Sequence, residues 1–449
     1  MIWLEFAVLL IMIIIGSRMK GIGLGLMGVL GMFIYVQVFR MRPVGPPGDI
    51  MLIILSIVTA SAALQAAGGL DYLVMIAEKI IRKNPKNITI IAPIVAFFLC
   101  LFSGTSHVVY SLLPVISDLS AKKGIRPERA LSSTVIASHM ALTGSPMAAC
   151  TAALVTVLSY PNASLDIMKI AIPACFIGSV AASLVMYNWG KDLKDDPIYQ
   201  EKMKDPEFRA YIESEDTTEK KDVPREAKLS VIIFGLAIVM IVLGGSFPHL
   251  VPNMVGGEGN AMVNADGSLK MVSIISIISL SAAALIMLFT KAKPDLIIKQ
   301  SLFLSMASAL VSVYGVVWMS ATFMAANEEA IKASLGAVTS SYPWVFTIAI
   351  FVMGILMFSQ GATTKAMMPL GLSLGIPALS LVAMFPAVSS FFVLPGYPTI
   401  IAAINIDKTG STKIGKYVVN HSFLLPGFVA TVVSIAVGFL LASLFGSGQ

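Results

Sequence analysis

The chain contains 449 residues, of which 57% are hydrophobic and only 12% are charged, and its mean hydropathy is +0.86. A soluble globular protein carries about 25% charged residues, so this composition excludes that class. Apolar runs that approach the ~20 residues needed to cross a bilayer as a helix recur along the chain, among them Leu52–Ala67, Ile170–Met186, Leu229–Gly244 and Val272–Phe289. Their polarity does not alternate with the period of two that membrane barrel strands require. The sequence therefore predicts a polytopic, all-α integral membrane protein.

The first apolar segment, Ile2–Ile15, is predicted to be a retained span. It has no basic residue before it and no small-residue cleavage site before Arg18, so it does not resemble a signal peptide. The three cysteines fall inside apolar segments, and the four histidines lack metal-ligand spacing. We therefore expect no disulfide framework, no bound metal and no cofactor, while a coupling Na⁺ or H⁺ stays open.

After three spans, the segment of about 88–120 is predicted to be a re-entrant hairpin. The loops on either side, Lys79–Lys86 and Lys122–Arg129, each carry four basic residues, so the positive-inside rule places both in the cytoplasm. The segment must then enter the membrane and return without crossing it. Its tip is the polar sequence SGTSH, Ser103–His107. Irregular backbone at membrane depth is tolerated only where it is buried in protein or lines a water-filled cavity.

The first repeat is predicted to end at residue 187 with a broken span of about 131–159 and one further span. The sequence TGSP interrupts the broken span, and its Gly144 and Pro146 are the predicted helix-break residues. The stretch RPER, Arg126–Arg129, precedes this span, and we interpret it as an anchor for topology and lipid headgroups.

Residues 188–228 are predicted to form a hydrophilic cytoplasmic linker. They contain nine Lys/Arg and twelve Asp/Glu, whereas the other long loop, Phe247–Lys270, has one basic residue. When the spans are threaded outward from this linker, 25 of the 31 lysines and arginines fall in cytoplasmic loops and five fall outside. The remaining one, Lys365, lies within a membrane segment. The net charge of +6 thus reflects the excess of Lys and Arg in cytoplasmic loops, which argues against nucleic-acid binding. The same threading places both termini in the periplasm.

The second repeat is predicted to span 229–449 and to follow the same plan. Three spans lead to a hairpin of about 344–375, which enters from outside and is broken at SQGATT, Ser359–Thr364. A broken helix of about 378–406 follows, then a last span. The sequence LPGYPT interrupts that helix, and Pro395, Gly396 and Pro398 are the predicted break residues.

The two halves match in short motifs as well as in plan. The sequence SGTSHVVYSLLP corresponds to SQGATTKAMMP, and each is followed about thirty residues later by its Gly/Pro break. An odd number of crossings per half gives the repeats opposite orientations. Interrupted segments at corresponding positions of inverted halves indicate a secondary transporter with its site near the membrane midplane. Helix N-termini beyond the tips would favour an anionic substrate.

The predicted substrate-binding residues lie at the two tips and the two breaks: Ser103, Gly104, Thr105, Ser106, His107, Thr143, Ser145, Ser359, Gln360, Thr363, Thr364, Lys365, Tyr397 and Thr399. An ionisable residue inside the membrane is a functional hypothesis by default, which singles out Lys365, although a structural pairing or snorkelling is the alternative. His107 could donate to a carboxylate or carry a proton, or be a satisfied buried histidine. The hydroxyl groups are either ligand donors or helix caps and back-bonds.

Two other functional classes fit the sequence less well. Ser and His in SGTSH suggest an intramembrane serine protease, but both lie in one tip, and there is no separate base-bearing helix or Gly-x-Ser-x-Gly elbow. A channel would need a continuous pore lining rather than two opposed dead-end hairpins. We therefore predict a transporter and no enzyme.

Long motifs along the whole chain resemble one family. LQAAGGLDYL, KNPKNITIIAPIV, SGTSHVVYSLLPVI, GIRPERALSS, SQGATTKAMMP, LPGYPTIIAAI and DKTGSTKIGKYVVNHSFLLPG are similar to the Dcu family of bacterial anaerobic C4-dicarboxylate transporters. HVVYSLLP and RPVGPPGDIMLII resemble its fumarate–succinate antiporter branch, which we favour. GGLDYL and TTKAMMP resemble the branch that is also associated with aspartate uptake.

The resemblance implies a multi-pass inner-membrane antiporter that takes up fumarate, malate or aspartate and releases succinate in anaerobic respiration. The alternative is dicarboxylate uptake driven by H⁺ or Na⁺, which sequence does not separate from exchange. By analogy with the ion-transporter superfamily, which the paired hairpins resemble, hairpins and broken helices would move as an elevator against a scaffold. We expect that scaffold to form a homodimer within membrane lipid.

Overall fold

The computed structural model describes most of the chain as helices. The described residues are 2–19, 22–46, 48–146, 148–158, 160, 163–214, 224–246, 250–251, 263, 267, 269–300, 303, 310–311, 314–315, 318–323, 325–327, 329–330, 344–357, 359–415 and 420–446. Across these residues the extended structure consists of two isolated bridges, Val263–Leu269 and Ile414–His421. The prediction of an all-helical protein is confirmed for the part of the chain that the structure describes.

The chain forms two compact units, and each takes segments from both sides of the linker. Unit 1 comprises Met1–Asp71, Ala149–Lys169 and Pro224–Val382, and unit 2 comprises Tyr72–Ala148, Ile170–Val223 and Ala383–Gln449. The two sequential repeats remain a prediction, and so does their inverted relation. Parts of this prediction lie outside the described residues, including most of 301–343 and the linker segment 215–223.

Unit 1 contains the first spans, the second hairpin and the short helix after the first break. Its helices are α1 (Ile2–Arg18), α2 (Gly23–Gln37), α3 (Gly48–Ala66), α8 (Ala149–Leu158), α12 (Arg225–Ser246), α13 (Met271–Phe289), α14 (Pro294–Ile298), α16 (Val345–Met357) and α17 (Gln360–Ser373). Within the unit, α3 packs on α13, α1 on α2, and α17 on both α8 and α16. The stacked rings of Tyr35 and Phe323, whose centroids are 6.2 Å apart, form part of its core.

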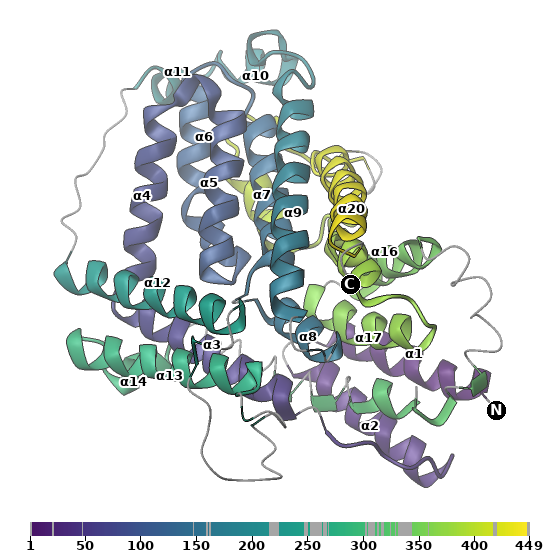
Figure 1. Cartoon of the computed structure of the whole chain (residues 1–449). Coiled ribbons are helices and arrows are strands. Elements are labelled where there is room, and N and C mark those ends of the chain that lie inside the picture. Colours follow the sequence, from purple (N-terminus) through teal and green to yellow (C-terminus); the bar gives the residue numbers. More distant parts are fainter. Residues whose placement is uncertain are drawn as a thin grey trace. The chain divides into compact units, whose positions relative to one another are not determined.

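Unit 2 contains the first hairpin, the described linker residues up to Ser214 and the last span. Its elements are α4 (Gly69–Lys83), η1 (Pro85–Asn87), α5 (Ile88–Ser103), η2 (Ser106–Ser111), α6 (Leu113–Lys122), α7 (Pro127–Gly144), η3 (Leu193–Asp195), α10 (Pro197–Lys202), α11 (Pro206–Glu213), η5 (Phe385–Val393), α19 (Pro398–Ile406) and α20 (Leu424–Gly446). Helices α4 and α9 (Ala163–Tyr187) begin in unit 1 and continue here, whereas most of α18 (Ala378–Met384) lies in unit 1. Figure 1 shows α5, α6 and α7 side by side, and α5 packs most closely on α7.

Several helices are long and apolar enough to cross a membrane. Four qualify among the described residues, or up to six if each bent helix pair counts as one span. The last of them, Leu424–Phe445, exposes apolar side chains such as Val432 and Leu440, which are 61% and 60% accessible. Because burying apolar surface away from water is favourable, such a face fits a lipid environment. The structure therefore supports a multi-pass membrane protein.

Candidate functional site

The tip of the first hairpin, in unit 2, is a junction between an α-helix and a 3-10 helix. Helix α5 stops at Gly104, whose φ of +68° is left-handed and whose N–H donates to the carbonyl of Cys100 at 2.9 Å. The Thr105 hydroxyl then accepts the N–H of His107 at 3.2 Å and caps η2. The His107 side chain is exposed and stacks on Tyr110. Local capping thus explains why these residue types follow one another here.

The first helix break lies beside this tip within unit 2. Helix α7 ends at Gly144, and the Ser145 hydroxyl donates to the carbonyl of Leu101 at 2.6 Å. A Cβ at Gly144 would lie only 3.0 Å from the backbone of Ile172, so close packing also requires glycine at this position. The Thr143 hydroxyl donates to the carbonyl of Met140 at 2.7 Å. Pro146 follows, and Met147 lies outside the described residues.

The second helix break is also part of unit 2. Pro395 and Gly396 separate η5 from α19, which begins at Pro398, and the two segments are bent by 52°. Helix α19 packs on both η2 and α7. The structure therefore brings together, in one unit, predicted site residues of the first tip and of both breaks.

His139 on α7 joins this group, and sequence reasoning missed it. Its Nε2 lies 2.8 Å from the hydroxyl of Thr399, and its ring lies 4.8 Å from that of Phe391 and 5.0 Å from that of Tyr397. His139 is fully buried, so these contacts hold it in one place. The sequence does contain one sign of this role: His139 stands four residues before Thr143, so both polar side chains lie on one face of the helix.

The second hairpin lies in unit 1, where α16 packs on α17. The Ser359 hydroxyl accepts the N–H of Ala362 and caps α17. The hydroxyls of Thr363 and Thr364 donate to the carbonyls of Ser359 and Gln360 at 2.8 and 2.7 Å. In this conformation the hydroxyl protons are thus used in back-bonds within the helix.

Lys365 differs from Thr363 and Thr364, because its ammonium group is not used in a back-bond of this kind. The residue is only 4% exposed, and the described part of the chain places no carboxylate within ion-pair distance of it. Its Nζ turns back toward the hairpin tip, 4.0 Å from where a Cβ on Gly361 would lie. A buried cation without a counter-charge is costly, so this position is suited to receive an anion.

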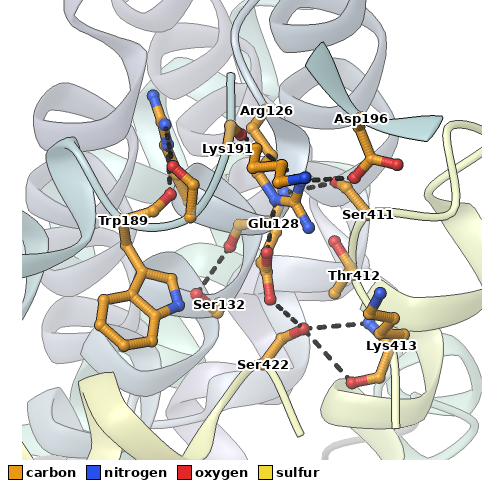
Figure 2. Close-up of polar contacts among 12 residues, drawn as sticks. Arg126, Glu128, Ser132, Trp189, Lys191, Asp196, Ser411, Thr412, Lys413 and Ser422 are labelled. Atoms are coloured by element: carbon orange, nitrogen blue, oxygen red, sulfur yellow. Dashed lines mark hydrogen bonds and ion pairs between the residues drawn. The ribbon is translucent and has the colours of Figure 1, made fainter. Parts of the chain in front are cut away.

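A polar cluster fastens three chain segments of unit 2 to one another (Figure 2). Arg126 lies at its centre and donates from Nε to Glu128 and from Nη1 to Asp196, both at 2.6 Å. The other carboxylate oxygen of Glu128 accepts a hydrogen bond from the Ser422 hydroxyl at 2.6 Å. The backbone N–H of Glu128 donates to Ser411 Oγ at 3.0 Å. We call these five residues the Arg126 cluster.

The Arg126 cluster corrects the interpretation of RPER as a lipid-headgroup anchor. Arg126 and Arg129 are only 6% and 8% exposed, and both are paired inside the protein. Arg129 donates to the carbonyl of Trp189 at 2.8 Å and to Asp192 at 3.1 Å. The segments around 126, 196 and 411 therefore meet in one place within unit 2.

Asp196 makes the stability of the Arg126 cluster depend on pH. Burial opposes its ionisation, but hydrogen bonds from Arg126 and from the N–H of Ile198, with the charge of Arg126, hold the pKa of Asp196 below its ordinary value. A lowered native pKa gives stability that is complete above the ordinary value of about 3.9 and is lost as the pH falls through the lowered one.

We expect the difference in melting temperature between the wild type and Asp196→Asn to stay constant from about pH 8 to pH 5 and to narrow below about pH 4. Thermal unfolding in detergent across this range measures it. A difference that already closes between about pH 7 and pH 5 would show that Arg126 does not lower this pKa.

Comparison with known proteins agrees with the helical architecture. The chain matches the family described as anaerobic C4-dicarboxylate membrane transporter over residues 1–446. Its similarity to a solved structure, the YdaH transporter of Alcanivorax borkumensis, has a TM-score of 0.55 at 14% identity and covers 100% of this chain and 98% of the other. That similarity concerns the fold alone.

Curated relatives extend over nearly the whole chain. The anaerobic C4-dicarboxylate transporter DcuB of Escherichia coli O6:H1 is 37% identical over 450 residues, which covers 99% of both chains. The C4-dicarboxylate transporter DcuA of Wolinella succinogenes is 38% identical over 443 residues, 98% of this chain and 99% of its own. DcuA of Escherichia coli K12 is 36% identical over 445 residues, 99% of both chains. The chain therefore belongs to the family of anaerobic C4-dicarboxylate membrane transporters.

Proposed function

We propose that this protein is a C4-dicarboxylate antiporter of the bacterial inner membrane, which takes up fumarate, malate or aspartate and releases succinate by alternating access. Membership of a dicarboxylate transporter family supports the substrate class. The observation that carries the proposal is Lys365, a buried cation with no carboxylate partner among the described residues, directly after a hairpin tip. A substrate carboxylate would supply the missing counter-charge.

The residues at the two tips and two breaks are proposed to contact the substrate as the protein changes conformation. In unit 2 the first tip lies beside both helix breaks, with Thr399 held by His139. We propose that the hairpins and broken helices move together as an elevator and that the chain is built as two inverted repeats. We further propose that the scaffold forms a homodimer and that both termini lie in the periplasm.

Uptake of labelled fumarate into proteoliposomes tests the exchange mechanism. We expect uptake only when succinate is enclosed, with no ion gradient, and no stimulation by enclosed butyrate, which lacks the second carboxylate. Uptake that ignores internal succinate but follows an imposed H⁺ or Na⁺ gradient would replace exchange by symport. The absence of uptake in both settings would overturn the dicarboxylate proposal itself.

A further inference from the structure

The second helix break interrupts the hydrogen-bond ladder that holds a helix straight. Pro395 and Gly396 separate η5 from α19, and the two segments are bent by 52°. A proline supplies no N–H to the ladder, so the backbone does not carry the helix through such a position. Side-chain contacts across the break therefore contribute to the direction in which α19 starts.

His139, on the neighbouring helix α7, contacts residues on both sides of this break. On the η5 side, the ring of Phe391 lies 4.8 Å from that of His139. On the α19 side, the ring of Tyr397 lies 5.0 Å away, and Nε2 lies 2.8 Å from the hydroxyl of Thr399. The rings of Phe391 and Tyr397 are themselves 4.3 Å apart. One side chain of α7 thus joins the end of η5 to the first turn of α19.

Burial makes this contact specific in direction. His139 and Thr399 are only 1% and 0% exposed, so bulk water does not compete for their hydrogen bond. Threonine is β-branched and has few χ1 rotamers, so a hydrogen bond to its Oγ1 fixes how the hydroxyl lies. Helix α19 also packs on η2, so a change in its direction would reach the first hairpin tip as well.

We propose that His139 is a positioning residue of the substrate site, which orients the hydroxyl of Thr399 without touching the substrate. This inference rests on the proposed function, in which Thr399 is one of the residues that contact the dicarboxylate. A hydroxyl that is oriented before binding loses less conformational freedom when it meets a carboxylate. Succinate affinity therefore depends on the hydrogen bond between His139 and Thr399, while the ring contacts of His139 contribute to stability.

His139→Gln and His139→Asn form a matched pair that separates the hydrogen bond from the ring. Both variants lose the ring contacts, so we expect both to melt below the wild type without ligand. The glutamine amide extends about as far as Nε2 and keeps a hydrogen bond to Thr399, whereas the shorter asparagine amide ends near the place of Nδ1. We expect His139→Gln to bind succinate within about twofold of the wild type and His139→Asn to bind it about three- to tenfold more weakly. Succinate titration of the purified proteins, below the melting temperatures of both variants, measures the affinities.

A double-mutant cycle with Thr399→Val identifies the origin of the difference. Valine keeps the shape of the threonine side chain and removes the hydroxyl that His139 is proposed to orient. With valine at position 399, the glutamine and asparagine variants should bind succinate equally. A difference that persists with valine would overturn the positioning role, and so would equal affinities of the two variants when Thr399 is intact.

The wild type separates this inference from the proposed function. If the wild type binds no succinate, the dicarboxylate proposal fails and the positioning role fails with it. If the wild type binds succinate and the two variants do not differ, the positioning role alone fails. Should His139→Asn not fold, His139→Leu takes its place in both comparisons, because leucine has nearly the volume of histidine and no hydrogen-bonding group.

Discussion

Replacing Lys365 with methionine is expected to weaken succinate binding by about ten- to hundredfold, because a hydrogen bond to a charged group contributes about 1.5–3 kcal/mol. The same change should raise the melting temperature of the ligand-free protein. A buried cation without a counter-charge is unfavourable, and an apolar side chain of similar length removes that cost. Thermal shift with increasing succinate in detergent measures both effects.

Lys365→Arg is the matched control, since it keeps the positive charge at the same place. We expect it to retain succinate binding better than methionine does, although the planar guanidinium does not reproduce the compact ammonium group. Wild-type affinity in Lys365→Met would remove Lys365 from the binding site. A lower melting temperature of that variant would show instead that the lysine has a stabilising structural partner.

Replacing Arg126 with alanine is expected to cost about 3–5 kcal/mol of unfolding free energy. The change leaves Glu128 and Asp196 buried without the guanidinium group that bridges them at 2.6 Å on each side. Arg126→Lys should recover little, because a single ammonium group does not reproduce the two separate bonds of the guanidinium fork. Denaturant or thermal unfolding in detergent measures the loss.

Lys204→Ala is the matched control for the Arg126 variant. Lys204 also pairs with an acid, Glu201, but their side chains are 72% and 73% exposed. Exposed pairs contribute at most about 1 kcal/mol, so this change should be nearly neutral. A loss in Arg126→Ala as small as in Lys204→Ala would show that the Arg126 cluster does not hold unit 2 together.

The Arg126 cluster joins the two helices that border the helix breaks in unit 2. Glu128 begins α7, and Ser411 follows α19 by a short loop whose Asp407 accepts the Ser411 hydroxyl at 2.8 Å. At their other ends the same two helices meet through His139 and Thr399. Helices α7 and α19 are therefore fixed to each other at both ends, which holds both helix breaks in register.

The sequence by itself determined the class of protein and the family, and it pointed to places where helices end. Apolar runs near 20 residues need only composition to be recognised, and a Gly or Pro interrupts a helix through its own backbone geometry. Gly104, Pro395 and Gly396 accordingly stand where described helices end or bend. Long family motifs carry the same local information. The inverted repeats and the elevator motion remain predictions, because they concern relations between segments.

The tertiary structure alone decided which side chains have partners. The sequence suggested that RPER is a headgroup anchor, but in the fold Arg126 pairs with Asp196 and Arg129 with Asp192, 60 to 70 positions further along the chain. His139 showed no metal spacing, yet it meets Thr399 from the other half of the sequence. A partner so distant in sequence is brought close only by packing, which no local pattern records. For the same reason, sequence placed Lys365 in the membrane, but only the fold showed that it is buried and has no carboxylate within ion-pair distance among the described residues.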